Sequence, residues 1–346
     1  MSSAPTPIPT ESDALSHAEQ AARTRRGYTF GLTAFGWWAV VVPVFFRVLT
    51  NEDIGNADPF EILAQRIVFG LPVLFAMLAL SKQFGPFLNA IRTWSSLRVL
   101  IPSTGLIALN WYFFIWAVSK DQLSHASLGY YISPLVSVAL GFVFLGERLR
   151  RAQWVAVALA IAAVCVLAWA EGSIPFVSII LPISFGLYGL LRKQANVGPS
   201  VGLTFEMLLL LPLSAGLLIW LEHTNRGVFL VGPNWISALM LLGGVVTIVP
   251  MVSFTAAARL LPLSTVGLLQ YSAPTVQLVL TAVFFGESFP PEKWAAFGLI
   301  WIAIVIFTVD AIRRGNQARR DRNGSDPDRA RQDAEPAGDR ATEMLE

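Results

Sequence analysis

Long apolar stretches alternate with short polar segments along the chain, and each stretch has the length of a membrane-spanning helix. A helix needs about 20 mostly apolar residues to cross the hydrocarbon core of a bilayer. A membrane β-barrel would instead show short segments of alternating polar and apolar residues. The pattern predicts an all-α integral membrane protein with ten transmembrane helices, at residues 28–49, 61–81, 99–118, 123–145, 152–170, 174–191, 201–221, 235–257, 264–285 and 293–312.

Composition agrees with this fold class. Apolar residues make up 54% of the chain and charged residues only 14%, against about 25% charged in a typical soluble domain. Nearly half of the charges lie in residues 1–27 and 313–346, which are predicted to be disordered tails. A net charge of +2, scattered over loops and tails, provides no surface for nucleic acid. The expected partners are the lipid bilayer and a small-molecule substrate.

Lys and Arg in the short loops predict the orientation, because cytoplasmic loops carry an excess of these residues. With the N-terminus inside, the predicted cytoplasmic segments near residues 82–98, 148–151 and 192–193 are basic. The first predicted outer loop, residues 51–59, carries only acidic charges. An even number of spans then returns the C-terminus to the cytoplasm.

The chain contains an internal repeat at a constant offset of 140 residues. Residues 124–134 resemble residues 264–274, and the Val-Phe-Leu-Gly-Glu of 143–147 resembles the Val-Phe-Phe-Gly-Glu of 283–287. The pattern predicts a first repeat and a second repeat with five helices each, at residues 28–170 and 171–312. Because five is odd, the repeats have inverted topology, which is typical of secondary transporters that bind substrate near the bilayer midplane between the repeats.

Several motifs resemble those of EamA-type permeases in the drug/metabolite transporter superfamily, and of its RarD-like branch in particular. The resemblance covers about residues 27–313. It implies two inverted five-helix repeats in a bacterial inner membrane, and transport, usually export, of small metabolites. The motifs are Asn-Trp-Tyr-Phe-Phe-Ile-Trp at 110–116, Gly-Tyr-Tyr-Ile-Ser-Pro-Leu-Val at 129–136, the pairs Gly146-Glu147 and Gly286-Glu287, and Gln270-Tyr271.

Two charged residues lie well inside predicted spans, and charges at that depth are functional candidates. They are Arg66 and Glu206, which occupy matching positions in the two repeats. Arg66 suits a carboxylate or other anionic group of the substrate. Glu206 is the candidate for proton coupling or for contact with a cationic group, because a buried carboxylate can bind and release a proton. The alternative is that each reaches an interface or forms a structural ion pair.

Proline inside a span frees a backbone carbonyl one turn earlier, which lipid tolerates only next to protein or a watery cavity. The predicted kinks at Pro134 and Pro274 have polar and aromatic neighbours. These residues are predicted to line a central cavity suited to amphipathic cargo, with hydrogen bonding between helices as the alternative for each one. They are Tyr130, Tyr131, Gln270 and Tyr271, together with Asn110 and Trp111 in the third span.

The repeated Gly-Glu pairs, Gly146-Glu147 and Gly286-Glu287, follow spans four and nine. Glycine at that position fits a helix C-cap. The glutamate is placed to pair with a nearby basic residue such as Arg150. Both pairs are therefore interpreted as gating or structural.

A membrane-embedded enzyme or a sensor without transport activity is the competing class. The three histidines have no metal-ligand spacing, and no span carries two acids. No phosphate-binding Gly-Lys loop is present. The single cysteine, Cys165, excludes an internal disulfide framework and is expected to be a small buried apolar side chain. The sequence therefore predicts no cofactor, no metal and no enzymatic activity.

Overall fold

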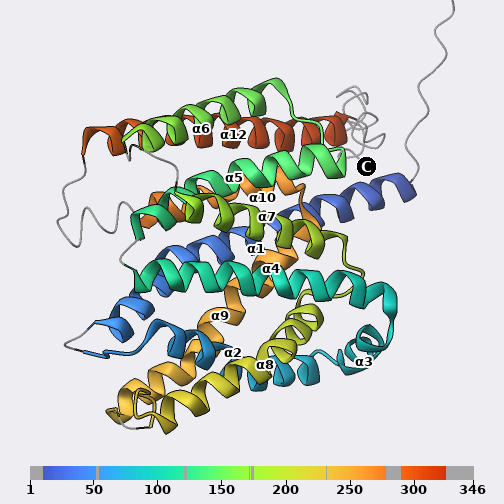
Figure 1. The fold of residues 1–346 in the computed structure, drawn as a ribbon. Coiled ribbons are helices and arrows are strands. Elements are labelled where there is room, and N and C mark those ends of the chain that lie inside the picture. Colours follow the sequence, from blue (N-terminus) through green and yellow to red (C-terminus); the bar gives the residue numbers. More distant parts are fainter. Residues whose placement is uncertain are drawn as a thin grey trace, which may run out of the picture.

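The computed structural model describes residues 11–51, 54–120, 123–170, 172, 175–230, 232–277 and 290–324. Every regular element within those ranges is a helix (Figure 1). The helices are α1 (Glu11–Thr50), α2 (Pro59–Leu80), α3 (Phe84–Arg92), α4 (Trp94–Ser119), α5 (Leu123–Leu145), α6 (Arg151–Ala170), α7 (Phe176–Gln194), α8 (Pro199–His223), α9 (Asn234–Leu260), α10 (Leu263–Gln270) and α12 (Pro291–Gly324).

Nine of the helices in the described ranges are long and apolar enough to cross a membrane, so the chain is a multi-pass membrane protein. They correspond to nine of the ten predicted spans. The remaining prediction, residues 264–285, begins with α10 and a further helical segment at 272–277. Its second half lies outside the described residues.

The outer helices extend beyond the predicted spans. α1 begins at Glu11 and α12 continues to Gly324, so both predicted tails are helical next to the bundle. These extensions are rich in Ala, Glu, Gln and Arg, which favour helix even without an apolar face to bury. The hydropathy pattern detects only the apolar part of such a helix.

The short helix α3 was not predicted, because it is too short to span a membrane. It is amphipathic: Phe87 and Ala90 are buried in a cluster with Leu78 and Leu100, whereas Leu88 is exposed. α3 therefore packs along the bundle between the ends of α2 and α4.

Helices from the two halves of the chain pack against each other throughout the bundle. α1 packs against α9, α4 against α7, and α2 against both α8 and α9. α5 contacts α7 and α10, and α6 lies beside α12 along one edge of the bundle (Figure 1). The interior is thus built from both halves.

The exposed position of Cys165 contradicts the expectation that it is buried. α6 packs against α12 through its other face, where Ala160 and Ala163 meet Phe297 and Ile300. In a membrane protein the face turned away from the bundle is apolar too. An apolar run therefore does not reveal which of its residues are buried.

Two adjacent glycines in α9 let α2 approach closely enough to bring Arg66 into the interior. A Cβ atom on Gly244 would lie 2.6 Å from the backbone of Phe69. A Cβ atom on Gly243 would lie 3.0 Å from Cγ of Arg66. The crossing of α2 and α9 therefore requires small residues at these positions, as is common for membrane helices.

Candidate functional site

Arg66 lies in the first half of α2, and its side chain is buried, with 8% exposed. Its Nε donates a hydrogen bond to Oγ1 of Thr247 on α9. Its guanidinium carbon lies 5.1 Å from the centre of the Phe46 ring and 5.8 Å from that of Trp111. Among the described residues, no carboxylate lies within 4.0 Å of the guanidinium.

Aromatic side chains continue outward from Arg66. The Phe114 ring lies 6.3 Å from the Phe46 ring and 6.2 Å from the Tyr130 ring. Tyr130 is close enough to Arg66 for an electrostatic interaction, yet 42% of it is exposed. We call this group the Arg66 site; its members are Phe46, Arg66, Trp111, Phe114, Tyr130 and Thr247.

The Arg66 site has the chemistry to hold an anion. A buried charge is costly unless it is paired, and the guanidinium presents several donors in a planar fork that matches a carboxylate. The aromatic faces stabilise the cation but do not neutralise it. The structure thus brings the predicted residues Arg66, Trp111 and Tyr130 together.

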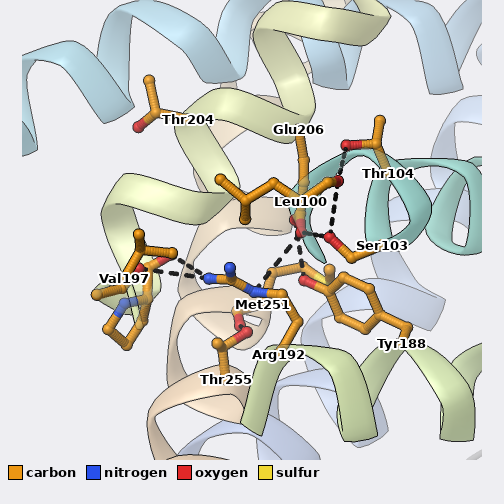
Figure 2. Close-up of polar contacts among 12 residues, drawn as sticks. Leu100, Ser103, Thr104, Tyr188, Arg192, Val197, Thr204, Glu206, Met251 and Thr255 are labelled. Atoms are coloured by element: carbon orange, nitrogen blue, oxygen red, sulfur yellow. Dashed lines mark hydrogen bonds and ion pairs between the residues drawn. The ribbon is translucent and has the colours of Figure 1, made fainter. Parts of the chain in front are cut away.

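Glu206 lies in a different cluster, shown in Figure 2. Its carboxylate accepts hydrogen bonds from Oγ of Ser103 at 2.7 Å and from the Tyr188 hydroxyl at 3.1 Å. Nε of Arg192 lies 3.6 Å from Oε1, and both side chains are almost fully buried. Glu206 and Arg66 therefore do not meet. The sequence left an interface position or an ion pair as the structural alternatives for Glu206, and the structure contains the ion pair.

Arg192 was missed by the sequence analysis, which ended the sixth span at residue 191. The helix α7 runs one turn further, to Gln194, and Arg192 points into the bundle. Its Nη2 donates to the carbonyls of Gly198 at 3.4 Å and Pro199 at 3.2 Å. A Cβ atom on Gly202 would overlap the guanidinium. The signal in the sequence that could have indicated this contact was Gly202, one turn before Glu206. A glycine there leaves room on α8 for a large side chain from another helix.

The remaining polar candidates from the sequence join helices. Nδ2 of Asn110 donates to the carbonyl of Leu181 at 2.9 Å and to Oγ of Ser184 at 3.1 Å, which joins α4 to α7. The Tyr271 hydroxyl donates to the carbonyl of Tyr131 at 3.1 Å, and both tyrosines are buried. These contacts match the alternative of hydrogen bonding between helices.

The two prolines behave differently. Pro134 lies inside α5, which continues through it to Leu145. α10 ends at Gln270, four residues before Pro274, where the missing backbone donor leaves a carbonyl free. The Gln270 side chain is buried there, and neither of its amide atoms has a hydrogen-bond partner among the described residues.

An aromatic layer lies between the Arg66 site and the Glu206 cluster. The rings of Phe185 and Phe254 are 4.6 Å apart, and Tyr188, which binds Glu206, stacks on Phe254. The layer fills the space between α1, α7 and α9. Its members are Phe35, Trp38, Phe185, Tyr188 and Phe254.

Gly146 ends α5 with a φ of +63°, as the C-cap interpretation expected. The Glu147 amide donates to the Gly141 carbonyl at 3.1 Å, a bond that satisfies an otherwise free carbonyl at the helix end. The Glu147 carboxylate does not bind Arg150, whose partner is Asp310 at 3.9 Å. Gly286 and Glu287 lie outside the described residues.

Glu147 instead caps the N-terminus of α10. Its carboxylate accepts from the amides of Leu263 at 2.6 Å and Ser264 at 2.9 Å, and from the Ser264 hydroxyl at 2.7 Å. Lys193 lies 3.9 Å from Glu147 and donates to the carbonyls of Ala258 and Leu261 at the end of α9. We call these contacts the α9–α10 clamp.

The helix α1 passes these groups in order. Arg23 bonds to the carbonyl of Arg259 near the clamp, Trp38 belongs to the aromatic layer, and Phe46 belongs to the Arg66 site. At about 1.5 Å per residue, Arg23 and Phe46 lie about 34 Å apart along the helix. The Arg66 site and the clamp therefore lie toward opposite ends of the bundle.

Comparison with known families gives a match over most of the chain. The sequence profile of the EamA-like transporter family matches residues 25–169 and, separately, residues 173–309.

Individual relatives also match over most of the chain. The chain is 40% identical over 295 residues to Protein RarD of Streptomyces exfoliatus, which covers 85% of this chain and 92% of that protein. It is 38% identical over 292 residues to Protein RarD of Escherichia coli (strain K12), with 84% and 97% covered. A solved crystal structure superposes with a TM-score of 0.63 at 20% identity, covering 82% of this chain and 97% of the other, which shows the fold alone.

Proposed function

The chain belongs to the EamA-like transporter family, and on this premise we propose that it is a secondary transporter of small organic molecules. It works by alternating access in a bacterial inner membrane, with export as the direction. The observation that carries the proposal is the Arg66 site, a buried cation with no carboxylate partner among the described residues and a half-exposed tyrosine beside it. Such a group inside a membrane bundle is suited to a substrate.

Inverted repeats supply the two alternating states, and the helix contacts support this architecture. A shift of 140 residues places the first predicted span, residues 28–49 of α1, on residues 168–189, which include most of α7. The same shift places α4 on α9, and α1 packs on α9 as α4 packs on α7. Likewise, Arg66 contacts α9 while its counterpart Glu206 contacts α4. The family profile also matches each half separately. Rocking of one repeat against the other then exposes the site to each side in turn.

Both termini are cytoplasmic in this proposal, which places the α9–α10 clamp at the inner face and the Arg66 site toward the outer face. We expect a cysteine at the exposed position 89, in α3, to react with a membrane-impermeant maleimide only in inverted vesicles. A cysteine at the exposed position 224, after α8, should react only in intact cells. The measurement uses a Cys165→Ser background, because the native cysteine is exposed. The opposite labelling pattern would refute the topology.

The clamp keeps the inner side closed in this proposal. Replacing Glu147 with glutamine removes the charge that caps α10 and pairs with Lys193. Loss of a helix cap costs about 1 kcal/mol, or about fivefold in the closed-to-open ratio. We expect Glu147→Gln to raise the labelling rate of Ser137→Cys, a buried position on α5, from the cytoplasmic side by about that factor. Glu19→Gln, at an exposed carboxylate on α1, is the control. Equal rates in both variants would leave Glu147 a purely structural cap.

Glu206 couples transport to protons in this proposal, since protonation would release its ion pair with Arg192 and its bonds to α4 and α7. We expect the double variant Arg192→Leu/Glu206→Gln, which leaves no unpaired buried charge, to abolish stimulation by a pH gradient while substrate exchange without a gradient continues. The measurement is uptake into liposomes with and without the gradient, again with Glu19→Gln as the control. Retained stimulation in the double variant would restrict Glu206 to a structural role.

A counterflow screen of the purified protein in liposomes tests the function as a whole. Liposomes are loaded with one unlabelled compound at a time, and uptake of its labelled form is followed. Saturable exchange of at least one small metabolite is expected. Absence of exchange across amino acids, organic acids, aromatic metabolites and chloramphenicol would contradict the proposal.

A further inference from the structure

We propose that the Arg66 site selects a flat organic acid with a single negative charge and no amino group. This inference rests on the proposed function, because it names the substrate class of the same site. Three properties of the site determine the class: its isolated positive charge, its aromatic walls, and the absence of an acidic side chain near Arg66 among the described residues.

The charge of the site specifies one anionic group. Arg66 is buried, and its only described side-chain hydrogen bond is to the neutral Thr247. Arg192, the other buried basic residue in the described part of the chain, is already paired with Glu206. A second negative charge on the substrate would therefore find no free cation at the site, and its desolvation would be uncompensated.

The walls of the site specify a flat apolar body. The rings of Phe46 and Trp111 lie on the guanidinium, and the chain of rings continues through Phe114 to Tyr130. A substrate whose carboxylate is held by Arg66 would extend its apolar part along these rings toward the half-exposed Tyr130. Pairing of aromatic rings strengthens binding about two- to tenfold beyond the burial of area, which favours a flat ring over a puckered one.

The surroundings of Arg66 disfavour an ammonium group. Glu61, at the start of the same helix, is turned away, because its carboxylate accepts from the amides of Val228 and Phe229 at 3.0 Å. The hydroxyl groups of Tyr130 and Thr247 are neutral polar groups of the site. An amino acid would thus bury its ammonium beside a cation with no carboxylate to receive it.

A matched set of compounds tests each property with binding rather than transport. The labelled probe is 3-phenylpropionate, and the competitors are 3-phenylpropionamide, phenylalanine and 3-cyclohexylpropionate. The amide removes the charge, phenylalanine adds an ammonium, and the cyclohexyl compound removes flatness, all on one skeleton. The protein is the full chain in lipid nanodiscs, assayed by scintillation proximity.

We expect 3-phenylpropionate to bind at least tenfold more tightly than the amide and phenylalanine, and severalfold more tightly than the cyclohexyl acid. Arg66→Gln should remove the preference for the acid over the amide, whereas Arg98→Gln, at an exposed arginine, should keep it. Trp111→Leu should reduce only the preference for the flat ring. The preferences of the unaltered protein test the inference even if a variant fails to fold.

Equal binding of phenylalanine or of the amide would overturn the inference, as would absence of 3-phenylpropionate binding at millimolar concentration. These outcomes are separable from failure of the proposed function. A protein that binds the acid selectively but exchanges nothing across liposomes would retain the site and lose the transport proposal. A protein that exchanges an amino acid or a neutral compound would retain the transport proposal and lose the proposed selectivity of the Arg66 site.

Discussion

Replacing Gly202 with alanine is expected to leave most of the protein molecules unable to fold stably. The new Cβ atom would overlap the guanidinium of Arg192, which is held between Glu206 and the carbonyls of Gly198 and Pro199. Displacing Arg192 leaves Glu206 as a buried charge without its partner. Breaking a buried ion pair in this way costs about 3–5 kcal/mol. The measurement is the thermal midpoint in detergent, followed by fluorescence-detected size exclusion.

Gly216→Ala is the matched control for this result. It lies on the same helix, and a Cβ atom there would meet no heavy atom within 4 Å. Alanine favours helix over glycine by about 1 kcal/mol, so Gly216→Ala should be neutral or stabilising. Adding Arg192→Leu and Glu206→Gln to Gly202→Ala should restore part of the stability, because both charges and the overlap are then removed. A stable Gly202→Ala protein would contradict the packing of Arg192 against α8.

Replacing Arg66 with glutamine is expected to cause the largest loss of transport among the site variants. A hydrogen bond to a charged group contributes about 1.5–3 kcal/mol, so the KM for an anionic substrate should rise about 10- to 100-fold. Arg66→Lys keeps the charge but loses the planar fork over Phe46 and Trp111, and an intermediate KM is expected. Initial rates of counterflow over a range of substrate concentrations give these values.

Arg98→Gln provides the comparison for Arg66, since it removes an exposed arginine near the N-terminal end of α4 and should leave KM unchanged. An unchanged KM in Arg66→Gln would show that the substrate does not contact the guanidinium. A loss of correctly folded protein, measured by size exclusion, would identify Arg66 as a structural residue instead.

Some features could be predicted from the sequence because they depend on local composition. The length of an apolar stretch predicts a span, and nine of the ten predicted spans correspond to long apolar helices in the described residues. A charge within a span is equally visible, so Arg66 and Glu206 were both found. The Gly-Glu motif predicted the C-cap at Gly146, because only the backbone conformation of that residue is involved.

The partners of these residues were decided by the tertiary structure. Glu206 pairs with Arg192, a residue that hydropathy assigned to a loop, and Glu147 binds the amides of α10 rather than Arg150. Tyr131 is buried while the adjacent Tyr130 is half exposed in the Arg66 site. Cys165 is exposed although its surroundings in the sequence are entirely apolar.

The physical reason is the solvent. In a water-soluble protein the outer face of a helix is polar and the inner face is apolar, so the sequence pattern reveals which face is buried. In a bilayer both faces are apolar, and helix contacts depend on close packing and a few polar bonds. The sequence by itself therefore determined nine of the long apolar helices in the described residues and the charges well inside them, although not Arg192 at the end of α7. Only the tertiary structure decided which residues face each other, and so which buried cation has no carboxylate partner among the described residues.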